Sequence, residues 1–245
     1  MLNNKLLMLI TLDIKRVFRD IKYVAFIIIL PIFFYIIYNE LFATNAAVRG
    51  IPWGEYSLVS MISFGIMGNA INLLGTKIAD EKKGMWYDYL KVSPISPKEY
   101  GISHIYSYLI ISILFTVLMF VVGFLYNGVS IDFYKMIEIG ILLNIGSIPF
   151  LLLALLVGEM GSLAQPFGTI IYLFLSFLGG LWMPIEAMPD TMQQIAKILP
   201  SYNYANLGWT VLADEKLEVV NFLFLIGYAA LFLLIYILLT NRRKE

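Results

Sequence analysis

The 245-residue sequence contains no cysteine, a single histidine and few charged side chains. The absence of cysteine excludes disulfide bonds and thiolate metal sites. One histidine, His104, cannot supply a histidine metal cluster, and the serine next to it points to another side of a helix, so a serine-protease pair is excluded. Charged residues make up 14% and hydrophobic residues 60% of the chain, against roughly 25% charged residues in an average soluble domain. A soluble core cannot bury this much apolar surface, so we expect a membrane protein.

Two sources of energy are also missing. The phosphate-binding pattern G-x-x-x-x-G-K-[ST] does not occur, so we expect no catalytic residue, no metal site and no cofactor bound by this chain. The long apolar runs have no ionisable residue near their centres, whereas an ion-coupled carrier usually needs one there. A transporter of this composition takes its energy from another polypeptide or conducts passively.

Six apolar runs approach or exceed the roughly 20 residues with which a helix crosses a bilayer. They are Tyr23 to Phe42, Tyr56 to Thr76, Ser103 to Tyr126, Ile137 to Val157, Leu163 to Met183 and Val219 to Thr240. None has the alternating polarity of a barrel strand. We therefore predict one permease domain over residues 1–245, all-α, with six transmembrane helices. Pro31 and Pro149 lie within runs and predict kinks.

The cations are concentrated on alternate connections, which predicts the orientation because Lys and Arg favour the cytoplasmic side. One side carries Lys5, Lys15, Arg16, Arg19, Lys22, Lys77, Lys82, Lys83, Lys91, Lys98, Arg242, Arg243 and Lys244. The other side has Arg49, Lys135, Lys197 and Lys216. We expect a multi-pass protein of the cell membrane with both termini in the cytoplasm.

Residues 1–22 form an amphipathic pattern at about 100° per residue. The apolar arc contains Leu6, Ile10, Ile14, Val17, Phe18 and Ile21, opposite five cations. This predicts an elbow helix on the membrane surface, with its cations toward anionic lipid head groups. The alternative is a basic flank that only directs the topology.

The connection at residues 77–102 combines charges, aromatic residues and prolines. A short amphipathic helix stopped by Ser93-Pro94 would present Trp86, Tyr89 and Leu90 to a groove on a partner protein. Aromatic anchors of this kind carry much of the energy of protein contacts. The alternative is that these aromatic side chains lie at the lipid head groups.

Polar and small residues recur at helical spacing in the second and fifth runs. In the second run these are Gly65, Gly68, Asn69, Asn72 and Thr76, and in the fifth Gln165, Thr169, Tyr172, Ser176 and Gly180. Small residues let helices approach closely, and polar groups in a membrane seek partners on neighbouring helices. These faces are candidates for helix packing, a dimer interface or the lining of a transport pathway.

The chain as a whole resembles the permeases of the ATP-binding cassette type-2 exporter family. The resemblance rests on the amphipathic N-terminus, the six runs, the charged stretch that leads to Pro94-Ile95-Ser96-Pro97, and two later segments. These segments are Gly179-Gly180-Leu181-Trp182-Met183-Pro184-Ile185-Glu186-Ala187-Met188-Pro189 and Ile195-Ala196-Lys197-Ile198-Leu199-Pro200.

This resemblance implies a coupling helix within 77–102, in which Glu81 to Leu90 contact a separate ATPase, and re-entrant helices within 184–218 on the outer side. It also implies two ATPase subunits that bind ATP and magnesium, and a second permease that is identical or paralogous. Membrane lipid is the remaining partner, and we expect none that is a nucleic acid.

Three classes of function are consistent with these observations. The first is the membrane subunit of an ATP-driven exporter. The second is a passive channel or secondary carrier, and the third is a membrane scaffold without transport. The uncharged runs favour a hydrophobic or amphiphilic cargo, such as a drug or antimicrobial compound, over an ion, lipid or lipid-linked glycan.

Overall fold

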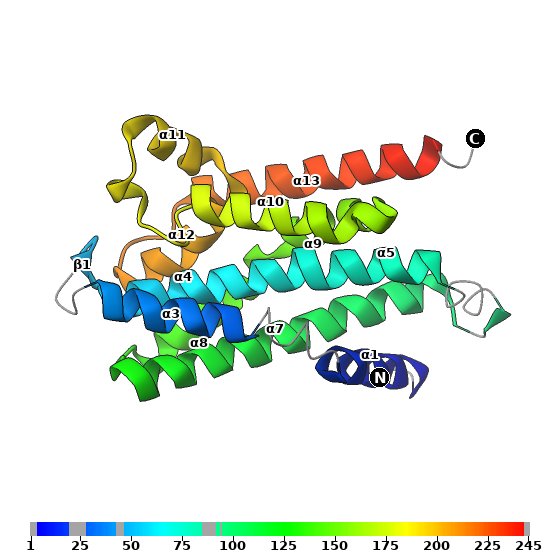
Figure 1. Ribbon diagram of the computed structural model, residues 1–245, viewed down its shortest axis with the longest axis horizontal. Coiled ribbons are helices and arrows are strands. Elements are labelled where there is room, and N and C mark those ends of the chain that lie inside the picture. Colours follow the sequence, from blue (N-terminus) through cyan, green and yellow to red (C-terminus); the bar gives the residue numbers. More distant parts are fainter. Residues whose placement is uncertain (1–3, 20–27, 43–46, 85–91, 94, 243–245) are drawn as a thin grey trace.

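The computed structural model describes residues 4–19, 28–42, 47–84, 92–93 and 95–242. Most helices in these ranges run side by side along the long axis of the molecule (Figure 1). Five helical segments are long and apolar enough to cross a membrane: Trp53–Lys83, Glu99–Asn127, Phe133–Gly158, Gly161–Leu178 and Val219–Asn241. They match the second to sixth predicted spans. The first span is described only as the shorter helix Leu30–Leu41, because residues 20–27 lie outside the described ranges.

The elements follow one another along the chain in a simple order. They are α1 (Asn4–Arg19), α3 (Leu30–Leu41), β1 (Ala47–Val48), β2 (Ile51–Pro52), α4 (Trp53–Gly68), η2 (Asn69–Leu74), α5 (Gly75–Lys83), α7 (Pro97–Asn127), α8 (Phe133–Gly146), α9 (Ile148–Gly158), η3 (Gly161–Leu163), α10 (Ala164–Leu178), η4 (Ile185–Ala187), α11 (Asp190–Ile198), α12 (Pro200–Leu212) and α13 (Val219–Arg242).

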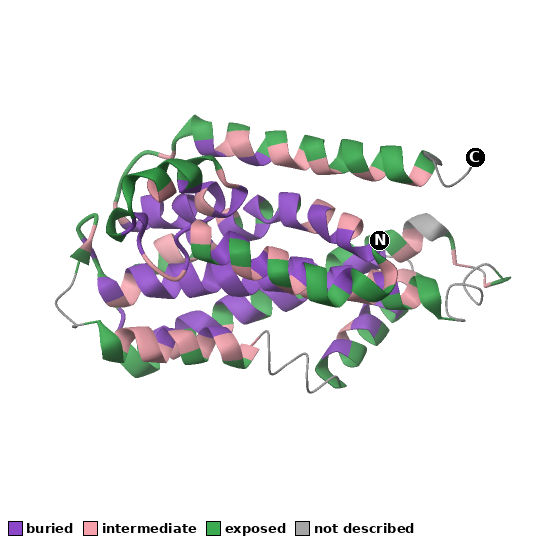
Figure 2. Cartoon of the chain, turned by 45° about the horizontal axis from the view of Figure 1, so that its top comes forward, coloured by how far each residue is buried: buried purple, intermediate pink, exposed green. Residues whose placement is uncertain are grey.

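The central element is the continuous helix made of α4, η2 and α5. Its α4 and η2 parts are almost entirely buried, whereas most of α5 is not, and α3, α7, α9, α10 and α12 pack around it (Figure 2). A helix enclosed on every side needs no polar face, which explains why α4 is apolar or small nearly all round. Its middle part, η2, is π-helical and therefore wound more loosely than an α-helix.

The fourth span bends in the middle, as Pro149 predicts. The helix is interrupted at Ser147, so that α8 ends at Gly146 and α9 begins at Ile148. Proline lacks the N–H that would continue the helical bonding, and its ring clashes with the preceding turn. The Ser147 hydroxyl donates to the Asn144 carbonyl at 2.7 Å and satisfies one group at the break.

Helix α1 lies across one end of the bundle, close to the start of α7 and the end of α5 (Figure 1). The end of α13 reaches the same end of the molecule. The helix is amphipathic as predicted, but its apolar face packs on the protein: Val17 is buried against Leu73 and Ile111, and Ile10 is also buried. Attachment of α1 to a membrane surface stays a prediction. The apolar side chains that remain exposed on α1 are Leu7, Met8, Leu12 and Phe18.

The opposite end of the bundle contains the short hairpin β1–β2 and the segment from η4 to α12. The hairpin turns at Arg49 and Gly50, which both have positive φ angles, of 55° and 77°, as the tightest hairpin turns require. The fifth span ends at Leu178, earlier than the predicted Met183, because the chain turns at Gly179 and Gly180.

The predicted re-entrant segment contains two helices of different character. Helix α11 is largely exposed, whereas α12 is almost entirely buried among α4, α8 and α13. Insertion of this segment into a membrane stays a prediction.

The packing of α1 leads to a stability test. Val17→Asp places a carboxylate between α1, η2 and α7, so we expect the free energy of unfolding to fall by on the order of 3 kcal/mol. Met8→Asp is the matched control, because Met8 is 64% exposed on the same helix. Unfolding of the purified chain by a denaturing detergent measures both effects. Equal midpoints for the two variants would contradict the packing of α1.

Candidate functional site

The polar faces of the second and fifth spans meet inside the chain. The Thr169 hydroxyl of α10 donates to the Asn72 side-chain oxygen of η2 at 3.3 Å. Both side chains are partly buried. An amide in an apolar environment is costly unless it is hydrogen-bonded, so this contact joins the two helices at a defined register.

An aromatic contact continues this interface toward the end of the bundle that contains α11 and the β1–β2 hairpin. Tyr172 is buried and stacks on Phe64 of α4, with ring centroids 4.6 Å apart and planes inclined by 22°. Gly68 permits this approach, because a Cβ at that position would lie 2.8 Å from the Tyr172 ring. Trp182 extends the aromatic group, with its ring centroid 5.9 Å from that of Phe64 and 5.5 Å from that of Phe34.

The other residues predicted for these faces have varied surroundings. Asn69 is fully buried. The hydroxyls of Thr76 and Ser176 donate to carbonyls of their own helices, those of Asn72 and Tyr172. Gln165 is exposed. The structure thus brings Asn72, Thr169 and Tyr172 together, which agrees with the helix-packing alternative. A role in a pathway or in a dimer interface stays a prediction.

Three of the four predicted ATPase-docking residues, Trp86, Tyr89 and Leu90, lie outside the described residues. The fourth, Glu81, is near the end of α5, and its side chain is only 13% exposed. Its carboxylate accepts a hydrogen bond from the Tyr100 hydroxyl of α7. The docking role of Glu81 stays a prediction, and the structure shows that this carboxylate also has partners within the chain.

Glu81 belongs to a buried group of charged side chains that sequence reasoning did not find. Lys77 Nζ lies 2.9 Å from Asp13 Oδ1, which joins α5 to α1. His104 of α7 contacts both carboxylates: its Nδ1 is 2.9 Å from Asp13 Oδ2 and its Nε2 is 3.2 Å from Glu81 Oε2. Arg16 Nη1 is 3.8 Å from Glu81 Oε1. We call these five residues the elbow network.

The electrostatics of Asp13 reflect this environment. Burial alone would raise the pKa of Asp13, but the contacts with His104 and Lys77 outweigh burial and lower the pKa below its ordinary value. A carboxyl group with a lowered pKa stabilises the fold above that ordinary value, and the stabilisation is lost as the pH falls through the lowered pKa. The two contacts of His104 are ion pairs only when its ring is protonated.

One feature of the sequence does indicate the elbow network. Asp13 stands among Ile10, Ile14 and Val17 on the apolar face of α1. A carboxylate on such a face needs a partner on the surface against which the face packs.

Other ion pairs lie at the two ends of the bundle. Near the elbow network, Lys82 pairs with Glu159, which joins α5 to the turn after α9. At the opposite end, Arg49 contacts Asn206 and Glu215, each at 2.6 Å, and Lys135 pairs with Asp214 at 2.7 Å. The described charges therefore lie at the ends of the bundle and leave its middle uncharged.

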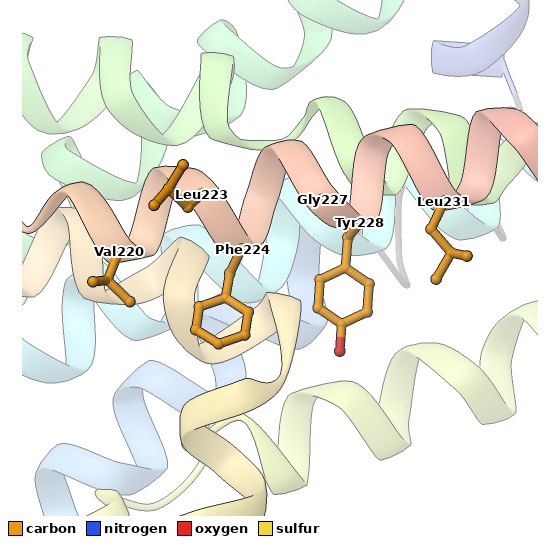
Figure 3. Close-up of a pocket in the computed structure, with 6 residues that line it drawn as sticks. All are labelled: Val220, Leu223, Phe224, Gly227, Tyr228 and Leu231. Carbon is orange, nitrogen blue, oxygen red and sulfur yellow. The ribbon is translucent and has the colours of Figure 1, made fainter.

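A shallow apolar groove of about 350 Å³ runs along α13 (Figure 3). Its lining residues are Val220, Leu223, Phe224, Gly227, Tyr228 and Leu231. The Tyr228 hydroxyl donates to the Ile198 carbonyl at 3.1 Å, at the edge of the groove. Most of α13 is exposed, so this groove is part of an apolar outer surface rather than a polar binding site.

Comparison with known proteins adds the family. Residues 4–208 match the family described as "ABC-2 type transporter". The chain is also 31% identical over 237 residues to a protein of Bacillus subtilis (strain 168) named "Putative transport permease YvfS", and the match covers 95% of each chain. The chain therefore belongs to the ABC-2 type transporter family.

Proposed function

We propose that the chain is the membrane permease subunit of an ATP-driven exporter in the cell membrane, with both termini in the cytoplasm. The observation that carries this proposal is the separation of charge: the spans are apolar in their middle, and the ion pairs lie at the ends of the bundle. Such a bundle offers no carboxylate with which to bind a coupling ion inside the membrane. Energy has to reach it through a contact at one end.

The contact for the energy source is the connection at residues 77–102. Members of this family generally work with an ATPase partner, and this connection carries the predicted docking residues Trp86, Tyr89 and Leu90. Two ATPase subunits, which bind ATP and magnesium, would dock on two permeases. Residues 77–83 of this connection are the last part of α5, at the end of the central helix, so a force applied there acts directly on that helix.

The cargo we propose is a hydrophobic or amphiphilic compound, such as a drug or antimicrobial molecule. The interface around Asn72, Thr169 and Tyr172 offers one amide, two hydroxyls and several aromatic rings, but no charge. Apolar walls with few polar groups suit amphiphilic ligands. A pathway between two permease subunits would use this interface if the two helices separate.

A transport assay tests the function as a whole. In vesicles that contain the permease and its ATPase, we expect uptake or release of fluorescent amphiphiles that requires ATP hydrolysis. The permease alone should move none of them against a gradient, because it has no energy source of its own. Uphill movement by the permease alone would identify a secondary carrier, and downhill conductance alone would identify a channel.

The docking surface leads to a second prediction. Changing Trp86, Tyr89 and Leu90 together to Ala should abolish co-purification with the ATPase, because each truncation of a buried aromatic anchor costs about 2 kcal/mol or more. The control changes the exposed Phe133 and Tyr134, at the opposite end, to Ala. We expect this control to retain the ATPase. A stable complex with the triple variant would contradict the docking surface.

The close contact of the second and fifth spans leads to a third prediction. Gly68→Ala forces Tyr172 away from α4, so we expect a loss of roughly 1–3 kcal/mol in the free energy of unfolding. Gly140→Ala is the control, because its Cβ would meet no atom closer than 3.8 Å. Detergent unfolding of both purified variants measures the difference. Equal stability would mean that the two spans do not pack as described.

A further inference from the structure

His104 connects three separate elements through one side chain. It belongs to α7, is 7% exposed, and contacts Asp13 of α1 through Nδ1 and Glu81 of α5 through Nε2. The Tyr100 ring packs edge-on against it at a centroid distance of 4.3 Å. Water therefore has little access to the imidazole. Each of its two nitrogens has one of these two carboxylates as its polar neighbour.

The protonation state of the ring decides whether both contacts are favourable. An ionised carboxylate only accepts hydrogen bonds. A neutral imidazole has one N–H and one nitrogen lone pair, so one of its nitrogens would face a carboxylate with a lone pair. The doubly protonated ring carries a positive charge and an N–H on each nitrogen, so it is attracted to both carboxylates.

We propose that His104 is a proton-controlled lock, which holds α1 against α5 and α7 while the ring carries two protons and loosens α1 when the ring loses one. This goes beyond the proposed function, because neither the ATPase nor a cargo takes part in it. It concerns the position of α1 on the bundle.

The charges around His104 support a loosening rather than a full release. The ring contacts Asp13 of α1, Glu81 of α5 and Tyr100 of α7, and two cations pair with these carboxylates, Lys77 with Asp13 and Arg16 with Glu81. With two protons on His104, three cations are placed against two carboxylates. When the ring is neutral, Lys77 still pairs with Asp13, but one of the two carboxylates loses its contact with His104. The link between α1 and the rest of the network is then weaker.

Under the proposed function, the position of the lock connects it to the ATPase. Glu81 lies in the last turn of α5, just before the connection that we assign to the ATPase. A closed lock would carry a displacement of this connection to both α1 and α7. With the lock open, α1 would not follow the displacement of the connection.

The protonation state can be measured without a substitution, because His104 is the only histidine. We would incorporate ¹⁵N-labelled histidine into the full-length permease in lipid nanodiscs and record the imidazole nitrogen signals. At pH 7.5 an ordinary histidine is about 90% neutral. We expect an imidazolium signal from both nitrogens at this pH, and a neutral ring at pH 7.5 would overturn the lock.

The movement of α1 can be measured by spin labels, because the chain has no native cysteine. Thr11→Cys and Ile113→Cys place labels on exposed positions of α1 and α7. We expect a narrow distance distribution while the imidazolium signal is present and a broader one at the higher pH at which that signal is lost. An unchanged distribution across this transition would overturn the proposal.

Two variants in the labelled background identify the group responsible. His104→Gln cannot carry a charge, so we expect a broad distribution at both pH values. Lys135→Gln removes an ion pair at the opposite end and should behave like the parent. A pH response that persists in His104→Gln, or a broad distribution in Lys135→Gln, would each overturn the lock. None of these measurements involves the ATPase, so they can fail or succeed independently of the transport assay.

Discussion

The structure depends on the burial of one helix, the continuous element α4–η2–α5, which the protein encloses along α4 and η2. A polar group on a helix enclosed by protein cannot reach water or lipid head groups, so it must find its partner within the helix or on a neighbouring helix. Ser60 accepts from the Trp209 indole at 3.1 Å, and the Ile66 carbonyl accepts from the Tyr108 hydroxyl at 3.2 Å. Each such bond fixes the side of the central helix against which a neighbouring helix packs.

The same constraint becomes stronger at the end of this helix, where its polar groups are charged. A buried ion pair contributes little net stability compared with apolar packing, but removal of one partner leaves an uncompensated charge and costs about 3–5 kcal/mol. The pairs of Lys77 with Asp13 and of Glu81 with His104 therefore add little net stability, but the loss of either partner would be costly. The elbow network determines the position of α1, whereas the apolar contact of Val17 supplies attraction without a precise register.

Hydropathy was enough to predict the long helices, because span length and apolar content are properties of a single segment. It could not predict what surrounds a segment. The pattern of α1 was amphipathic, yet an apolar face can meet lipid or protein equally well, and only Asp13 on that face indicated protein. The end of α10 at Leu178 and the turn at Gly50 depend on positive φ angles, which a run of apolar residues does not reveal. The contact of Asn72 with Thr169 joins residues 97 positions apart, so no local pattern contains it.

These features together explain how a bundle with an uncharged middle can respond to a partner at one end. Under the proposed function, a push on the connection after Lys83 acts first on α5, and the elbow network passes it to α1 and α7. Toward the opposite end, α5 continues into η2, a π-helical segment of the kind that is often found at functional sites and at kinks in helices. That segment carries Asn72, which contacts α10. A change in winding there would separate or rotate the polar faces of the second and fifth spans, while α4 stays fixed by its packing against α12. Under the proposed function, we therefore expect η2 to be the part of the core where a force on α5 is converted into an opening.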